Sequence, residues 1–369
     1  MKIAYLIEYF KPFSRGAENN CYYLAKELAK KHEVHVYTSD RQNGKVAKSF
    51  EEIDNIKVHR FKPKLRHKYY LSMTPGLWDV LKEDYDVVHV HSFGFLWHDL
   101  IVLMLKIKGF KVVNTPHGPF MALKKYNTRE NLFKFIIRTI EKFVNRLYDF
   151  VIQVNPEQYK WLEKEGVNKE RIRFVPNGIC EESFEKIKGK NNYKIKGKKI
   201  ISYVGAVDKY KGLDQVIKVL PHFKDLIFYI VGDDNGDRKR LEGLSKKLKV
   251  SNRVKFTGRI DEKNKLKVLD ASEVFILPSE WEAFGIVILE AMARGNAIIS
   301  TKTEGGNFLI GKENGFLYEF NDLGVLKERL GELINDQKLI EKMKKTNLKK
   351  AKEFLWKDIA KDLEKVYLE

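Results

Sequence analysis

VFILPSEWEAFGIVILEAMARGNAIISTKTEGG, residues 274–306, is the stretch that decides the fold. Its first four residues form a continuous apolar run, which is typical of a strand buried on both faces of a sheet. Residues 285–294 carry a face of small residues and are followed by Gly295, a pattern that predicts a helix ending at this glycine. A buried strand followed by a helix is the unit of a parallel α/β sheet, in which ligands bind at the carboxyl ends of the strands.

The start of this helix is the candidate ligand site. The backbone N–H groups of Phe284, Gly285 and Ile286 would be unpaired there and would offer a positive dipole end to a phosphate. Glu282 precedes this anion site and Glu290 follows it, in the spacing E-x7-E. Carboxylates only accept hydrogen bonds and therefore suit the hydroxyls of sugars. We expect this segment to hold a nucleotide sugar, against the alternative of an ordinary strand, loop and helix with surface glutamates.

The stretch resembles the donor site of glycosyltransferase family 4, a group of retaining, metal-independent enzymes with the two-domain GT-B fold. The residues that carry the resemblance are P-S-x-x-E-x-F-G, then E-A-M-A-x-G around the second glutamate, then G-G at 305–306. The resemblance implies an α/β protein with two Rossmann-like domains whose parallel sheets face across a cleft. It also implies that Glu282 contacts the transferred sugar and that Glu290 binds the ribose of the donor.

A second part of the resemblance lies in YVGAVDKYKG, residues 203–212, where the family pattern is G-R-x-x-x-x-K-G. Gly205, Lys211 and Gly212 are kept, whereas Ala206 stands where the family has an arginine. The resemblance assigns Gly205 and Lys211 to the donor pyrophosphate, where Lys211 would stabilise the leaving phosphate. Otherwise Lys211 is a surface lysine in a loop. Three cations are candidates to replace the missing arginine: Lys209, Arg15 and Arg259.

Three further loops match the family. FKPFSRGAENN, residues 10–20, is similar to the family's G-G-x-E loop and keeps Gly16, which would let the backbone approach the donor. His117, at an H-G position, is assigned to the active site beside the donor sugar and the acceptor. Arg259 and Ile260 are assigned to the base of the donor. The alternatives are a plain strand-to-helix turn for Gly16 and a hydrogen-bonded loop histidine for His117.

No metal is expected. The run GDDNGD, residues 232–237, lacks D-x-D spacing and lies where the family has a glycine-rich loop. His89 and His91 alternate along DVVHVHS, and we expect them on opposite faces of a strand, at least one of them structural, without a third ligand nearby.

Alternating strands and helices fill both halves of the chain, which is the pattern of doubly wound parallel sheets. Expected strands in the first half lie at about 2–7, 34–38, 56–61, 86–90, 111–115, 150–154 and 172–175, and a second series starts at 200. The expected parts are an acceptor-side domain at 1–185, a lysine-rich linker at 186–199, a nucleotide-sugar domain at 200–350 and a terminal segment at 351–369. The helix in that segment resembles one that, in the family, packs back on the first domain.

The formal net charge of +19 fits a solvated lysine-rich surface or an anionic partner. No nucleic-acid module is present, and anionic lipid headgroups or an anionic lipid-linked acceptor fit better. Residues 131–147 fit either a core-facing helix or a basic helix on a membrane, and residues 62–78 are a second membrane candidate. No leader-like or membrane-spanning run occurs and two distant cysteines lack metal-like spacing. We therefore expect a cytoplasmic protein, peripheral at the inner face of the membrane at most.

The sequence thus predicts a retaining, metal-independent glycosyltransferase of the hexosyltransferase type. It would move a sugar from a UDP or GDP donor to a hydroxyl of a glycan or lipid-linked acceptor, with no cofactor besides this substrate. A same-fold epimerase or hydrolase, or a non-catalytic nucleotide-sugar-binding protein, stays open, the latter because of Ala206. A dinucleotide-dependent dehydrogenase is disfavoured because no G-x-G-x-x-G follows the first strand of either half.

Overall fold

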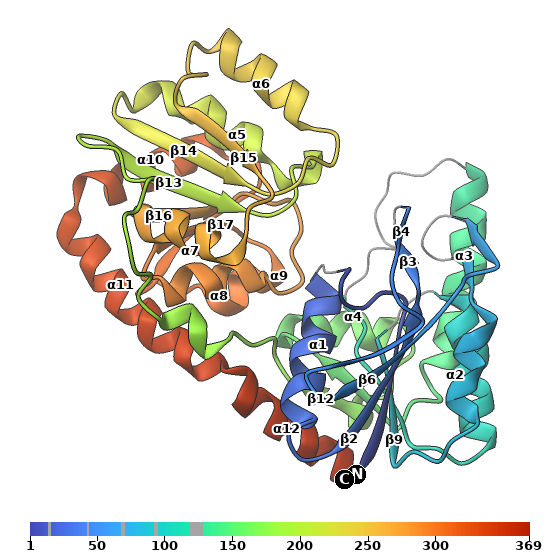
Figure 1. Ribbon diagram of the computed structural model, residues 1–369. Coiled ribbons are helices and arrows are strands. Elements are labelled where there is room, and N and C mark those ends of the chain that lie inside the picture. The colour runs from blue at the N-terminus through green and yellow to red at the C-terminus, as the bar shows by residue number, and fades with distance from the viewer. Residues whose placement is uncertain (14–15, 43, 68–70, 92–94, 118–127) are drawn as a thin grey trace. The chain divides into compact units, whose positions relative to one another are not determined.

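In a computed structural model, the chain folds into two compact units (Figure 1). Unit 1 comprises Met1–Asn177 and Trp356–Glu369, and unit 2 comprises Gly178–Leu355. The structure describes residues 1–13, 16–42, 44–67, 71–91, 95–117 and 128–369.

An eight-stranded sheet forms the centre of unit 1, in the order β12-β11-β10-β9-β1-β2-β6-β5. Its strands are β1 (Lys2–Ile7), β2 (Glu33–Ser39), β5 (Phe50–Ile53), β6 (Ile56–Phe61), β9 (Val87–His91), β10 (Val112–Asn114), β11 (Phe150–Gln153) and β12 (Ile172–Phe174). Neighbouring strands are parallel except in the β5–β6 hairpin. The strand order reverses at β1 and β9, which is where an open α/β sheet binds ligands at its carboxyl edge.

Within the described residues, unit 1 also contains two short antiparallel ribbons and five α-helices. The ribbons are β3 (Arg41–Gln42) with β4 (Lys45–Val46), and β7 (Leu65–His67) with β8 (Leu71–Met73). The helices are α1 (Gly16–Leu28), α2 (Leu96–Ile107), α3 (Thr128–Val144), α4 (Tyr159–Lys164) and α12 (Trp356–Leu368).

The terminal helix α12 belongs to unit 1, although the whole of unit 2 precedes it in the chain. It lies beside α1 (Figure 1), where the rings of Tyr23 and Trp356 stack with centroids 5.5 Å apart. Its buried side chains recur at helical spacing: Trp356, Ile359, Ala360, Leu363, Val366 and Tyr367. This apolar stripe accounts for the return of the chain, because a helix buries such a face against another element.

Helices α2 and α3 present both a core face and an apolar outer face. On α3, Ile137 and Val144 are buried, so the core-facing interpretation of 131–147 holds for that side. Large apolar side chains are nevertheless exposed on the two helices: Leu100, Leu103, Ile107, Phe135, Ile140 and Phe143. None of the helices in the described parts of the chain combines the length and apolar character needed to cross a bilayer. The other membrane candidate, 62–78, lies partly outside the described residues.

Unit 2 contains a six-stranded, fully parallel sheet in the order β15-β14-β13-β16-β17-β18. Its strands are β13 (Lys199–Val204), β14 (Leu226–Val231), β15 (Val254–Gly258), β16 (Val274–Leu277), β17 (Ala297–Thr301) and β18 (Gly315–Tyr318). Its helices are α5 (Leu213–Val219), α6 (Arg238–Lys247), α7 (Glu262–Ala271), α8 (Ile286–Ala293), α9 (Glu304–Leu309), α10 (Leu323–Asn335) and α11 (Gln337–Ala351). The order reverses between β13 and β16, so the loops after these two strands flank the expected ligand site.

The boundary between the units differs from the expected linker at 186–199. The chain enters unit 2 at Gly178 and leaves it at Leu355, where the backbone N–H of Ile179 donates to the carbonyl of Phe354 at 2.7 Å. The lysine-rich segment itself is attached to unit 2, since the Asn191 side chain donates to the carbonyl of Lys267 on α7 at 2.7 Å. Its composition is that of a linker, but this hydrogen bond and another from Lys267 Nζ to the carbonyl of Lys190, at 3.1 Å, hold it against α7.

Candidate functional site

The loops after β13 and β16 are pressed against each other. Gly212, at the end of the first loop, has φ of 63°, and a Cβ there would lie 2.2 Å from the carbonyl oxygen of Pro278 in the second. Gln215 on α5 donates to the same oxygen at 3.0 Å. Only glycine tolerates both this backbone conformation and this approach. Side chains of one loop can therefore reach those of the other.

Lys211 and Glu282, the two candidates from these loops, form an ion pair with each other. The Lys211 Nζ donates to Glu282 Oε1, although the residues are 71 positions apart, and their side chains are only 12% and 15% exposed. Ser279 Oγ donates to the same carboxylate oxygen at 2.8 Å. Burial alone would lower the pKa of Lys211, but the Glu282 carboxylate and Tyr210 outweigh it and raise this pKa. Lys211 is therefore a cation at the point where the strand order reverses.

The start of α8 has the form expected of an anion site. Gly285 is its N-cap, with φ of 76°, and no side chain caps this helix end. Phe284 is buried, and its ring centroid lies 5.9 Å from that of Phe308 and 6.3 Å from that of Phe354. Because its side chain packs in the core, only the backbone of Phe284 is expected to contact a ligand.

The G-G pair downstream holds the loop that carries Glu282. The N–H of Gly305 donates to the carbonyl of Glu282 at 3.0 Å. A Cβ on Gly305 would lie 2.2 Å from the carbonyl oxygen of Phe284. The start of α9 could therefore not lie this close to the loop if residue 305 had a side chain. The G-G match is thus explained by packing.

Glu290 lies inside α8 and is held by Lys265 of α7, a residue that the sequence patterns did not single out. Lys265 Nζ is 2.9 Å from Glu290 Oε1, whereas Glu290 Oε2 is buried and has no hydrogen-bond partner within the described chain. Burial raises the pKa of Glu290 and Lys265 opposes that rise. The free oxygen is an acceptor that a ligand hydroxyl could satisfy.

The other predicted donor contacts lie at the same edge of the sheet. The N–H of Gly205 donates to the carbonyl of Val231 at 2.9 Å, which joins the ends of β13 and β14. Ile260 is half-buried and precedes α7. Arg259 is exposed, with its Nη1 3.5 Å from Asp233 Oδ2.

The position of the family arginine is taken by Ala206, and the three candidate cations differ in what the structure describes of them. At Ala206 the carbonyl accepts a hydrogen bond from the Tyr203 hydroxyl at 2.9 Å. Lys209 is exposed. Arg15, the third candidate, lies outside the described residues.

Two aspartates of the acidic run at 232–237 form hydrogen bonds and an ion pair within the protein. Asp234 Oδ1 accepts hydrogen bonds from the backbone N–H groups of Gly236, Asp237 and Arg238 at 2.8 to 3.2 Å, and Asp237 pairs with Arg240 at 2.6 Å. Within the residues that the structure describes, no group of three or more His, Cys, Asp or Glu side chains is placed to bind a metal.

In unit 1, His117 follows β10, is half-buried and lies against the buried His91. Its Nε2 is 2.9 Å from His91 Nδ1, and burial lowers the pKa of His117 to about 4. The expectation that His89 and His91 lie on opposite faces of β9 is wrong, because residues i and i+2 of a strand share a face. Their ring centroids are 4.5 Å apart, and His89 also bonds to Thr115 at 2.7 Å.

Gly16, the other predicted contact in unit 1, is the first residue of α1. A Cβ there would meet nothing within 4 Å in the described chain. No contact with the described residues therefore requires a glycine at position 16, in contrast to Gly212 and Gly305.

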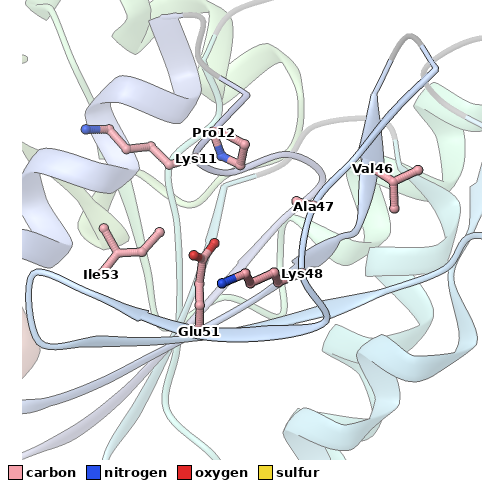
Figure 2. A pocket seen from close by; sticks show the side chains of 7 residues that line it. All are labelled: Lys11, Pro12, Val46, Ala47, Lys48, Glu51 and Ile53. Carbon is pink, nitrogen blue, oxygen red and sulfur yellow. The ribbon is translucent and has the colours of Figure 1, made fainter.

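Unit 1 also contains a cavity of about 400 Å³ beside the loop after β1 (Figure 2). It is lined by Lys11, Pro12, Val46, Ala47, Lys48, Glu51 and Ile53. The buried Arg60 ties these segments together, since it donates to the carbonyls of Lys11 and Lys48 and pairs with Glu51 at 2.6 Å. Because Arg60 neutralises Glu51, the lysines give the lining a positive character that suits an anionic or hydroxyl-rich group.

Two Rossmann-like units with parallel sheets are the architecture of the GT-B glycosyltransferases. Residues 14–183 match the family described as Glycosyltransferase Family 4, and residues 184–350 match Glycosyl transferases group 1. The chain belongs to glycosyltransferase family 4.

Curated relatives agree with this assignment, and a solved structure agrees with the fold. The chain is 25% identical to an uncharacterized glycosyltransferase of Methanocaldococcus jannaschii, over 97% of this chain and 96% of that protein. It is 29% identical to the UDP-Gal:alpha-D-GlcNAc-diphosphoundecaprenol alpha-1,3-galactosyltransferase of Escherichia coli, over 70% of this chain and 68% of that protein. Its fold is similar to that of Anabaena Alr3699/HepE, solved in complex with UDP and glucose, with a TM-score of 0.79 and 18% identity over 99% of this chain and 98% of that one.

Proposed function

We propose that this glycosyltransferase moves a hexose from a nucleoside diphosphate sugar to an acceptor hydroxyl with retention of configuration at the anomeric carbon and without a metal ion. The observation that carries the proposal is the buried Lys211–Glu282 pair beside the uncapped start of α8. A cation and a helix dipole suit a diphosphate, and a carboxylate next to them suits the sugar hydroxyls. UDP is the favoured donor nucleotide, since the E. coli relative and the Anabaena structure are both described with it.

The chemical step is a same-face substitution in this proposal. The bond between the anomeric carbon and the diphosphate oxygen breaks while the acceptor oxygen bonds to that carbon from the same side, and the acceptor proton passes to the departing diphosphate. Lys211 stabilises the charge that grows on the leaving oxygen, which is the kind of interaction that lowers a barrier most. Glu282 stabilises the positive charge that develops on the sugar ring.

Unit 1 supplies the acceptor side in this proposal. The cavity beside Lys11 and Lys48 would take the acidic or hydroxyl-rich part of a glycan or lipid-linked acceptor (Figure 2). A lipid-linked acceptor requires contact with a membrane, and the apolar side chains exposed on α2 and α3 provide a surface for it. The basic residues Lys142 and Arg146, both exposed on or just after α3, favour an anionic membrane face.

Donor binding and turnover test the proposal directly. Calorimetry in excess chelator should show binding of UDP, and incubation with UDP-hexoses and a lipid-linked diphosphate acceptor should give a product whose anomeric configuration, read by NMR, equals that of the donor. Donor hydrolysis or epimerisation without acceptor would instead indicate the alternative enzymes. Donor binding with no turnover under any condition would indicate a binding protein.

Membrane contact is tested with vesicles. Co-sedimentation with phosphatidylglycerol vesicles should exceed that with phosphatidylcholine vesicles, and Phe143→Ser should lower it. Phe174→Ser, an exposed phenylalanine on β12 of the same unit, is the matched control and should bind as the wild type does. Equal loss in both variants, or no binding by the wild type, would rule out this surface.

A further inference from the structure

Lys265 is placed to act on the nucleotide site through Glu290. It lies in the first turns of α7, shortly after Arg259 and Ile260, and its Nζ is 2.9 Å from both Glu290 Oε1 and Glu262 Oε1. The two carboxylates differ in setting, since the Glu262 side chain is 67% exposed and that of Glu290 is 19% exposed. Lys265 itself is 14% exposed. The strongest electrostatic partner of this buried lysine is therefore Glu290.

The two carboxylate oxygens of Glu290 differ in their partners. Oε1 is occupied by Lys265, whereas Oε2 is buried with no partner within the described chain. An acceptor left unsatisfied in a buried position costs free energy until a donor reaches it. A ribose presents two neighbouring hydroxyl donors, and Oε2 is the acceptor that remains for one of them.

We propose that Lys265 is a positioning residue for ribose recognition, which holds Glu290 by Oε1 so that Oε2 accepts a hydrogen bond from a ribose hydroxyl of the donor nucleotide. The inference rests on the proposed function, in that it takes the ligand to be a nucleoside diphosphate sugar. It adds a residue from α7, the helix that follows the loop expected to contact the base, so base contact and ribose contact share one element. Lys265 touches no reacting atom and acts only through Glu290.

Two charged groups of the protein set the ionisation of Glu290, and both lie on α7. Burial raises its pKa most, Lys265 lowers it, and Glu262 raises it. A protonated Glu290 loses acceptor capacity, so ribonucleotide affinity should fall as the pH decreases through this pKa. Removing Lys265 removes the lowering contribution and should move this fall to a higher pH.

The experiment compares the wild type with Lys265→Met, Lys265→Arg, Glu262→Gln and Glu290→Gln by calorimetry. The ligands are UDP and 2′,3′-dideoxy-UDP, or the GDP pair if the wild type prefers guanine, between about pH 5.5 and about pH 8.5. The wild type should prefer the ribonucleotide by about tenfold or more, as expected for a hydrogen bond to a charged group. Lys265→Met and Glu290→Gln should each lose most of this preference. Lys265→Arg and Glu262→Gln should keep it.

The pH series separates positioning from a merely structural tie between α7 and α8. In Lys265→Met the loss of UDP affinity at low pH should begin at a higher pH than in the wild type, while dideoxy-UDP affinity should show no such shift. An unchanged ribose preference in Lys265→Met, with the preference lost in Glu290→Gln, would overturn the role of Lys265. Equal weakening of both ligands would overturn it as well. A wild type that binds neither nucleotide would instead refute the proposed function.

Discussion

Glu282→Gln is expected to separate the binding of bare nucleotide from turnover. Glu282 holds Lys211 in a mostly buried ion pair. A diphosphate that takes Lys211 must therefore displace the carboxylate first. The glutamine keeps the size of the side chain and can still accept the hydrogen bond from Ser279, which now reaches Oε1 at 2.8 Å. It removes only the charge that competes with the phosphate.

The size of the effect follows from the burial of the pair. A hydrogen bond to a charged group contributes about 1.5 to 3 kcal/mol, and each 1.4 kcal/mol corresponds to about a factor of ten in affinity. Part of this is recovered when the displaced carboxylate meets the sugar or solvent, so UDP should bind Glu282→Gln at least as tightly as the wild type and up to about tenfold more tightly. Turnover at saturating donor should fall by about 100 to 1000 fold, as when one preorganised stabiliser of a transition state is removed.

Calorimetry with UDP and single-turnover kinetics with the UDP-sugar measure the two quantities on the same variants. Ser279→Ala is the matched control, because it removes a neighbour of Glu282 without changing the charge of the pair. Its nucleotide affinity should stay close to that of the wild type. The reasoning is refuted if Glu282→Gln weakens bare UDP as much as Glu290→Gln does, because both glutamates would then bind the nucleotide.

Three further predictions use other parts of the molecule. Lys211→Ala should lower the single-turnover rate by about 100 to 1000 fold, and Lys209→Ala should not; equal rates would place the phosphate contact elsewhere. Gly305→Ala should lower the free energy of unfolding by about 2 kcal/mol or more, since its Cβ would lie 2.2 Å from a backbone carbonyl oxygen. Gly311→Ala, whose Cβ would meet nothing closer than 3.8 Å, should cost far less in the same urea titration. Burial lowers the pKa of His117 to about 4 from about 6.5 in an unfolded chain, so the unfolded chain binds a proton first as the pH falls. Stability should therefore decrease from about pH 6.5 toward about pH 4, and urea midpoints that are equal at about pH 7 and about pH 5 would contradict this.

The main strands could be predicted because they are short apolar runs buried on both faces. The expected strands at 56–61 and 274–277 coincide with β6 and β16. The hairpin strand β5 was not predicted, since its sequence FEEI carries two glutamates and its edge position leaves one side unpaired. Strand β18 was also missed, because GFLY is brief and begins with a glycine.

The spacing of residues within one segment pointed to the two candidate glutamates. It could not point to the lysines that pair with them, because these come from other segments of the chain. Spacing placed Glu282 and Glu290 on either side of a helix start, and this is where the structure has them. Their lysine partners come from other strand–helix units, so no local pattern links them. The same-face placement of His89 and His91 needed only the two-residue period of a strand, and there the prediction misapplied that period.

The two glutamates of the E-x7-E segment are each paired with a lysine, and the geometry of each pair determines what ligand binding must do to it. Glu290 gives one oxygen to Lys265 and keeps the other unpartnered within the described chain, so a ribose hydroxyl can bind without breaking the pair. Glu282 gives the same oxygen to both Lys211 and Ser279, and Lys211 is also the cation that a diphosphate needs. Within the described residues, Lys211 is the ion-pair partner of Glu282, so a diphosphate that takes Lys211 would compete with this carboxylate. In the proposed mechanism, donor binding opens this pair and the released carboxylate becomes available to the sugar while the diphosphate is held.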